Sequence, residues 1–263
     1  LSAREGDYIS GPSDAMPWYG GQSVLQVLDS FEKEQPRVDK PLRLPVQDIY
    51  KFTADGDDRR IVAGRIETGS VTVNDQVVFL PSGKHSRVAS IEQFNAPVEE
   101  TAYAGESTGI TLSEQIYIRP GEVRCKMGQQ VAKSSTRLRA NMFWLSSQPM
   151  IMDKRYKMKL ANSQVAVWLT DIDTVLDASD LTSISNRKQI ERHDVAECTL
   201  ETLRPVACDE AADVAQTGRF VIIDNYEIAG GGVILEAEQE TDSLVQEHVR
   251  QREEAWDRSP ITK

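Results

Sequence analysis

The sequence is poor in cysteine and histidine and has no long hydrophobic run. There are three cysteines and three histidines among 263 residues. Cys125, Cys198 and Cys208 lie far apart, with no C-x-x-C pair and no histidine at metal-ligand spacing, so we expect reduced core thiols and no metal site. No stretch of about 18 apolar residues and no signal-peptide pattern is present. We therefore expect a cytoplasmic protein that neither inserts into a membrane nor is secreted.

Acidic side chains outnumber basic ones: the sequence has 41 acidic and 30 basic residues and a net charge of -11. Nucleic-acid affinity comes largely from Lys and Arg that release phosphate counterions, so binding of nucleic acid is not expected. The densest basic positions are Arg59 with Arg60, and a second group formed by Lys154, Arg155, Lys157 and Lys159. Solvated surface is the simplest interpretation of both groups.

Motifs for catalysis are also missing. A nucleotide-hydrolysing site needs a glycine-rich phosphate loop, and the nearest imitation, Gly128 to Ser134, is one residue short and has Ala132 in place of the second glycine. No G-x-S-x-G nucleophile elbow occurs, and the histidines have no evident orienting partner. We expect no catalytic residue, no bound cofactor and no nucleotide turnover in this chain by itself.

Short segments rich in β-branched residues dominate the middle of the sequence. The composition, 40% hydrophobic and 27% charged, is that of a folded protein, and the length suits two domains. Because turn residues separate the segments so closely, we predict an all-β fold with two consecutive small barrels. The predicted strands are 61–66, 70–73, 76–80, 87–91, 140–145, 155–160, 164–169 and 218–223, followed by a bend or bulge at Gly230–Gly232 that enters a closing strand.

Short helical segments are predicted at both ends. Val24, Leu25, Val27, Leu28 and Phe31 form one apolar face, which we expect to pack on a core, and Ser23 is the expected N-cap. At the other end, Val245, Val249, Arg252 and Trp256 fall on one face of a charged helical tail.

Four glycine-containing stretches carry a resemblance to a known family. In order they are Val62 to Lys84, Arg87 to Ile91, Ala104 to Leu112 and Ile118 to Val123. They resemble the second domain of translation-factor GTPases. Within that superfamily, three further stretches are similar to the GTPase subunit of bacterial sulfate adenylyltransferase: Met16 to Gly21, Asp39 to Tyr50, and Thr217 to Asp224 with Gly230 to Ile234.

The resemblance implies a domain organisation. Residues 1–38 would be the C-terminal remnant of a GTPase domain, 39–135 barrel domain II, 136–237 barrel domain III and 238–263 a charged helical tail or linker. Ser2 and Ala3 resemble the last guanine-contacting motif, and GTP and Mg would bind to the GTPase domain of the longer parent. We further hypothesise that the loop from Thr53 to Arg60 faces that domain, which makes Arg59 and Arg60 candidate residues for interdomain coupling.

The resemblance also implies partners and a function. The barrels would be a non-catalytic part of a regulatory subunit that couples GTP hydrolysis to adenylylsulfate synthesis in sulfate assimilation. Its partners would be the catalytic adenylyltransferase subunit, the GTPase domain and, in fused relatives, an adenylylsulfate kinase. Two alternatives remain open: the barrels of an elongation-factor-like GTPase that binds aminoacyl-tRNA, and a free-standing barrel adaptor without nucleotide chemistry.

Overall fold

The structure, a computed structural model, describes residues 1–32, 35–51, 59–93, 97, 99–177, 183–184 and 187–238. It forms two compact units, Leu1–Pro36 and Arg37–Lys263, which are described separately below.

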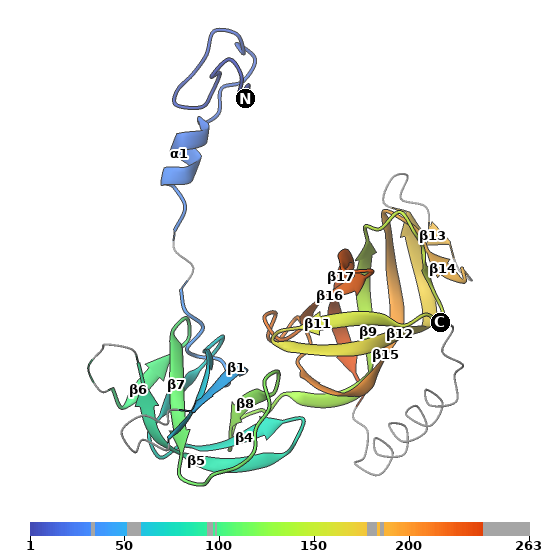
Figure 1. Cartoon of the computed structure of the whole chain (residues 1–263). Helices are drawn as coiled ribbons and strands as arrows, with labels where there is room; N and C mark the ends of the chain where they lie inside the picture. Colours follow the sequence, from blue (N-terminus) through green and yellow to red (C-terminus); the bar gives the residue numbers. More distant parts are fainter. Residues whose placement is uncertain are drawn as a thin grey trace. The chain divides into compact units, whose positions relative to one another are not determined.

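The first unit contains the helix α1, Val24–Asp29 (Figure 1). Ser23 is its N-cap, as predicted: the Ser23 hydroxyl accepts from the Gln26 backbone N–H, and the Gln26 side chain accepts from the Ser23 backbone N–H. This reciprocal capping box satisfies two donors that the first turn of a helix leaves unpaired. Beside it, the rings of Tyr8 and Tyr19 meet edge to face, with centroids 4.8 Å apart.

The expected packing of the α1 apolar face on a core is wrong within the described residues. No residue of α1 is buried, and Leu25, Leu28 and Phe31 are 46%, 51% and 69% exposed. A unit of this size has too little interior to cover such a face, since chains below about 40 residues rarely form a hydrophobic core alone. The helical periodicity therefore predicted the element correctly and its environment incorrectly.

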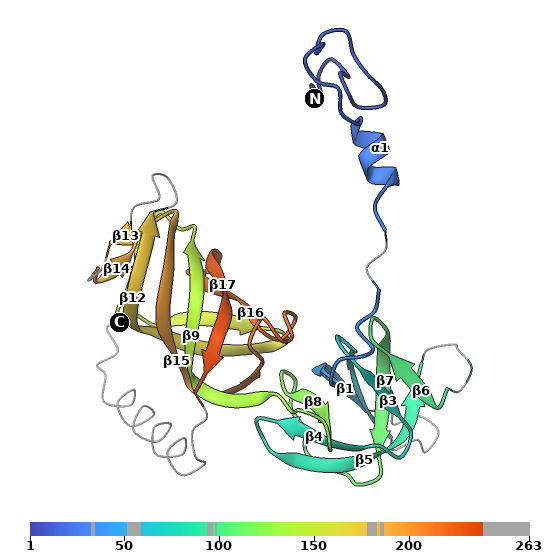
Figure 2. The ribbon, with the colours of Figure 1, turned by 180° about the vertical axis from the view of Figure 1, so that it is seen from behind.

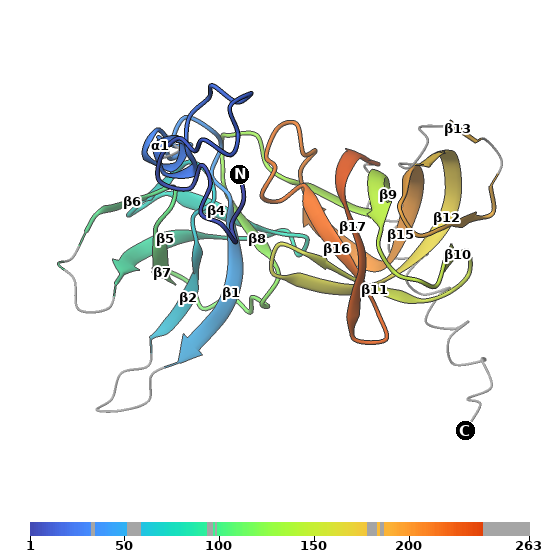
Figure 3. The same ribbon diagram turned by 90° about the horizontal axis from the view of Figure 1, so that it is seen from above.

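Barrel II, the first of two barrels in the second unit, is closed by six strands in the order β1-β2-β7-β5-β4-β8. A two-stranded sheet of β3 and β6 lies outside that ring. The strands are β1 (Leu44–Lys51), β2 (Arg60–Arg65), β3 (Ser70–Thr72), β4 (Gln76–Leu80), β5 (Lys84–Glu92), β6 (Thr101–Tyr103), β7 (Ser107–Leu112) and β8 (Val123–Lys126). Figure 3 shows the ribbon made by β1 and β2.

Barrel III contains a seven-stranded sheet in the order β11-β16-β17-β9-β15-β12-β13. A further pairing between β11 and β12 closes six of these strands into a ring, and β13 extends the edge of β12. Figure 2 shows β17, β9, β15 and β12 side by side. The strands are β9 (Lys133–Trp144), β10 (Met150–Ile151), β11 (Tyr156–Leu160), β12 (Ser163–Asp177), β13 (Ser183–Ile184), β14 (Gln189–Ile190), β15 (Asp194–Cys208), β16 (Arg219–Asp224) and β17 (Glu227–Ala237).

The alternation of side chains along these strands builds one core in each barrel. On β11, Tyr156, Met158 and Leu160 are buried, whereas the intervening Lys157 and Lys159 are exposed. Such alternation is typical of a strand with one face in the core and one in water. The predicted all-β fold of two consecutive small barrels is therefore confirmed, and each barrel has six strands.

The glycines 230–232 lie inside β17, and the predicted bulge is found at the first of them, where the register against β16 shifts between Ile228 and Gly230. A Cβ on Gly230 would lie 2.7 Å from Trp144 Cε3, and one on Gly232 would lie 2.2 Å from the carbonyl oxygen of Asn141. Gly230 and Gly232 are needed because the neighbouring strand β9 approaches closely. A second register shift of β17 lies between Ile234 and Glu236. The predicted C-terminal helix with Val245, Val249, Arg252 and Trp256, and residues 53–58 of the predicted coupling loop, lie outside the described residues.

Candidate functional site

A cavity of about 480 Å³ opens at barrel II. Its walls come from β1, from β2 with the residue before it, and from the end of β7 with the segment that follows. The volume falls within the range of about 300–1,000 Å³ that is usual for small-molecule sites. Its lining includes Asp48, Arg59, Arg60, Glu114 and Tyr117.

The two arginines predicted from the sequence both line this cavity. The Arg59 guanidinium forms an ion pair with Glu92, 3.2 Å between Nη1 and Oε2, and both side chains are partly exposed. Arg60 is the first residue of β2, is exposed, and pairs with Lys51 of β1 across the ribbon. The structure thus brings Arg59 and Arg60 into one site, while their role in interdomain coupling stays a prediction.

Tyr117 is a residue of this cavity that the sequence analysis missed. Its ring is 63% exposed, and two cations lie over it: Lys84 Nζ at 5.3 Å and the Arg119 guanidinium at 5.7 Å from the ring centroid. Lys84 Nζ also donates to the Tyr117 carbonyl oxygen. Such cation–π contacts hold an exposed ring in place, so the mouth of the cavity presents an aromatic face beside positive charge. No periodicity in the sequence marks Tyr117, because it lies in the irregular segment between β7 and β8.

The other predicted pair, Ser2 and Ala3, lies in the first unit. Ser2 forms an isolated bridge with Asp7, and its hydroxyl accepts from the Glu5 backbone N–H at 3.3 Å. Ala3 is exposed. These bonds order a tight turn at the start of the chain, and the guanine-contacting role stays a prediction.

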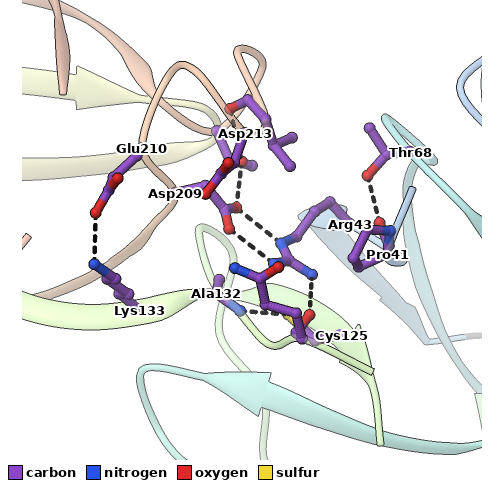
Figure 4. Close-up of polar contacts among 12 residues, drawn as sticks. Pro41, Arg43, Thr68, Cys125, Ala132, Lys133, Asp209, Glu210 and Asp213 are labelled. Carbon is purple, nitrogen blue, oxygen red and sulfur yellow. Dashed lines mark hydrogen bonds and ion pairs between the residues drawn. The ribbon is translucent and has the colours of Figure 1, made fainter. Parts of the chain in front are cut away.

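A second site is the junction between the two barrels, which centres on a buried ion pair (Figure 4). Arg43, which directly precedes β1, meets Asp209, which directly follows β15, through two bonds: Nε to Oδ2 at 2.8 Å and Nη2 to Oδ1 at 2.7 Å. The Arg43 and Asp209 side chains are 1% and 5% exposed. Bidentate pairs of this kind fix geometry as well as adding energy.

The remaining polar atoms of this pair are satisfied. Arg43 Nη1 donates to the carbonyl oxygens of Leu42 and Gln130, at 3.0 and 2.9 Å, and the Thr217 hydroxyl donates to Asp209 Oδ2 at 2.6 Å. Burial lowers the pKa of Arg43, but the hydrogen bond to Asp209 and the negative charges nearby outweigh burial and raise it overall. The guanidinium is therefore cationic at every pH at which the protein folds.

Weaker contacts surround the Arg43–Asp209 pair. Lys133 on β9 pairs with Glu210 at 2.6 Å, and Lys40 Nζ donates to the Asp213 carbonyl oxygen. Asn162 Nδ2 donates to the Pro45 carbonyl oxygen at 3.1 Å. In the segment Gly128 to Ser134, which partly matches a phosphate-loop motif, Lys133 occupies the position of the motif's lysine. The structure places Lys133 at the start of β9 and not before a helix.

An apolar contact completes the junction. Val123 and Cys125 of β8 pack with Ala132 and with Ala207 of β15. All three cysteines are free and buried. Burial raises the pKa of Cys125, while the nearby charge of Arg43 acts in the opposite direction. Burial also raises the pKa of Cys198 and Cys208 to about 12, so neither thiol is a nucleophile at neutral pH.

Within the described ranges, no three His, Cys, Asp or Glu side chains come together in a way that could hold a metal ion. No helix there is long and apolar enough to span a membrane.

Comparisons with known proteins match both barrels. The family described as elongation factor Tu domain 2 matches residues 59–123, and the family described as GTP-eEF1A C-terminal domain-like matches residues 137–235. The solved structure of sup35 complexed with GDP superposes with a TM-score of 0.70 at 22% identity, over 91% of this chain and 58% of that one. A likeness at this level of identity shows the fold.

Two kinds of relative have similar identity. Sulfate adenylyltransferase subunit 1 of Aliivibrio fischeri is 29% identical over 238 residues, 89% of this chain and 48% of that protein. Elongation factor 1-alpha of Pyrobaculum aerophilum is 32% identical over 243 residues, 90% of this chain and 53% of that protein. The chain spans about half the length of these curated relatives.

Fold and matches together define the class as the tandem β-barrels of translation-factor GTPases. More specifically, the chain belongs to the elongation factor Tu family, and its two barrels are of the domain 2 and domain 3 types of that family.

Proposed function

We propose that the chain is the barrel region of the GTP-dependent subunit of a sulfate adenylyltransferase, where it couples GTP hydrolysis to adenylylsulfate synthesis. The observation that carries this proposal is the similarity to sulfate adenylyltransferase subunit 1 along nearly the whole chain, at 29% identity over 89% of its length. The bifunctional enzyme NodQ of Rhizobium sp. is 28% identical over 93% of the chain. The proposal assigns residues 39–135 and 136–237 to the two barrels of that subunit.

In this proposal the barrels have a mechanical role. The catalytic adenylyltransferase subunit performs the adenylyl transfer, and the GTPase domain of the parent protein binds GTP and Mg²⁺. The Arg43–Asp209 pair and the apolar contact at Cys125 support movement of the two barrels as one body, because breaking a buried ion pair is strongly unfavourable. Packed bodies of this kind convert a local change at a nucleotide into a displacement at a distant surface. We also propose that this chain is located in the cytoplasm together with these partners.

We propose that Arg59 and Arg60 couple the nucleotide state of the GTPase domain to the barrels. They line the cavity of barrel II, where Arg59 directly precedes β2 and Arg60 is its first residue. The test is GTP hydrolysis by the polypeptide in which the GTPase domain is joined to these barrels, measured with and without ATP, sulfate and the catalytic subunit. Arg59→Ala with Arg60→Ala should lower the stimulation by the partner about fivefold or more, which is the scale of a typical coupling between sites.

A matched control keeps the experiment specific. Lys157→Ala with Lys159→Ala removes two exposed cations from barrel III and should leave the stimulation unchanged. Equal stimulation in the wild type and in the arginine variant would contradict the role of Arg59 and Arg60.

The second candidate is an elongation-factor-like function, in which the barrels bind aminoacyl-tRNA. It is favoured by the 32% identity to elongation factor 1-alpha of Pyrobaculum aerophilum. The net charge of -11 argues against it, because contact with RNA phosphates requires a cationic surface. A gel-shift titration with aminoacyl-tRNA at low salt separates the two candidates, and a salt-dependent complex would favour the elongation-factor function.

A further inference from the structure

The inner face of barrel II holds two buried polar side chains that no described protein group satisfies. Arg124 on β8 is 0% exposed, and none of its three guanidinium nitrogens has a hydrogen-bond partner within the described residues. Ser86 on β5 is 8% exposed, and its hydroxyl oxygen likewise has no such partner. Buried polar groups in folded proteins are nearly always hydrogen-bonded, so two buried polar side chains without a hydrogen-bond partner in one barrel require an explanation.

The strand register places both side chains in the same interior. Arg124 lies opposite Phe79 of β4 and opposite Leu44 of β1, and Ser86 lies opposite Val77 of β4. Side chains of directly opposed residues in an antiparallel pair project to one face. Phe79, Leu44 and Val77 all belong to the core of barrel II, so Arg124 and Ser86 project into that core as well.

The guanidinium keeps its charge in this apolar setting. Burial lowers the pKa of Arg124, the negative charge of Asp75 offsets only part of this effect, and the resulting pKa is about 9. The Asp75 carboxylate is bonded to Lys126, 2.8 Å from Nζ, and makes no bond to Arg124. At neutral pH barrel II therefore contains a cation to which no carboxylate among the described residues is hydrogen-bonded, an arrangement that is strongly unfavourable unless a counter-charge is bound.

We propose that Arg124 and Ser86 form an internal binding site for a small monovalent anion, of the halide class. The guanidinium and the hydroxyl both supply donors, which is what a halide requires, and the anion supplies the missing negative charge. The residues opposite them in the strand register, Leu44, Phe79 and Val77, are apolar and offer no further side-chain donor of the kind that a larger oxyanion needs. The anion is thus a structural ligand of barrel II and is separate from the cavity that Arg59 and Arg60 line.

Thermal unfolding of the whole chain tests this site. Chloride replaces gluconate, an organic anion too large for the interior, at constant ionic strength. A ligand that binds only the folded state should raise the Tm by about 3–6 °C when its concentration is about tenfold above its dissociation constant. Arg124→Met should abolish this chloride dependence, whereas Arg87→Met, which removes an exposed cation from β5, should retain it. Ser86→Ala should shift the dependence to about tenfold higher chloride.

Diffraction from crystals grown in bromide gives a second readout that needs no variant. We expect an anomalous peak within hydrogen-bond distance of the Arg124 guanidinium. A peak absent from the wild-type barrel, with water oxygen in its place, would overturn the proposal. Equal chloride dependence in the wild type and in Arg124→Met would do the same.

Discussion

At the scale of single residues, the Arg43–Asp209 pair decides how firmly the two barrels are joined. Neither residue stands out in the sequence, because 166 positions separate them and Arg43 lies between two leucines. Sequence patterns report local periodicity and give no information on which distant charges meet. The same limit applies to Arg124, whose burial follows only from its place opposite Phe79 and Leu44.

Removing one partner of this pair should be more harmful than removing an exposed pair. Asp209→Ala leaves the Arg43 guanidinium buried without its carboxylate, and we expect the free energy of unfolding to fall by about 3–5 kcal/mol. Urea denaturation followed by tryptophan fluorescence measures the change. Arg137→Ala is the control, because Arg137 and Glu238 are 49% and 53% exposed and such pairs contribute about 0–1 kcal/mol. Similar losses in the two variants would contradict this account of the junction.

The cysteines make a prediction about pH and reactivity. Burial raises the pKa of Cys198 and Cys208 to about 12 in the folded state, above the value of an unfolded thiol. The folded protein therefore holds these protons more tightly, so its stability is fully present below about pH 8.5 and declines as pH rises toward 12.

A thiol reagent such as Ellman's reagent checks this at pH 8. We expect Cys198 and Cys208 to react slowly in the native protein and rapidly in denaturant, because only the thiolate is nucleophilic. Rapid labelling of both under native conditions would show that the two thiols are not buried as described.

At the scale of elements, the sequence predicted about half of the strands and missed β15, one of the two longest. The predicted strands 76–80 and 155–160 match β4 and β11 to within a residue. Residues 194–208 were not singled out, although they form β15 between β9 and β12 in barrel III. Pro205 and a register irregularity between Glu201 and Val206 interrupt its alternation, and proline inside a run argues against a central strand.

The glycines of β17 give a prediction at this scale. A side chain on Gly232 would overlap the Asn141 carbonyl oxygen at 2.2 Å, whereas the nearest atom to a Cβ on Gly231 is the Phe220 carbonyl oxygen at 3.2 Å. Gly232→Ala should lower the free energy of unfolding by about 1–3 kcal/mol, as overpacking does in other cores. Gly231→Ala is the matched control and should lose clearly less. If denaturant titrations gave the same loss of unfolding free energy for both variants, β9 and β17 would have to lie farther apart than in the structure described.

At the scale of the whole molecule, fold and function differ in how far the sequence reveals them. Glycine-punctuated strands between residues 62 and 123 were sufficient to predict the barrel and its family. They do not distinguish a sulfate-activating role from a translational one, because both kinds of relative are about 30% identical to this chain. The common barrels account for that similarity, whereas a partner is recognised by surface residues that the common fold leaves free to vary.

Binding to the two possible partners is the most direct measurement of the central claim. The purified chain is titrated by calorimetry with the catalytic subunit of sulfate adenylyltransferase and, separately, with aminoacyl-tRNA under the same buffer conditions. We expect a saturable complex with the catalytic subunit and no heat of binding with the tRNA. Saturable binding of aminoacyl-tRNA, with none to the catalytic subunit, would contradict it.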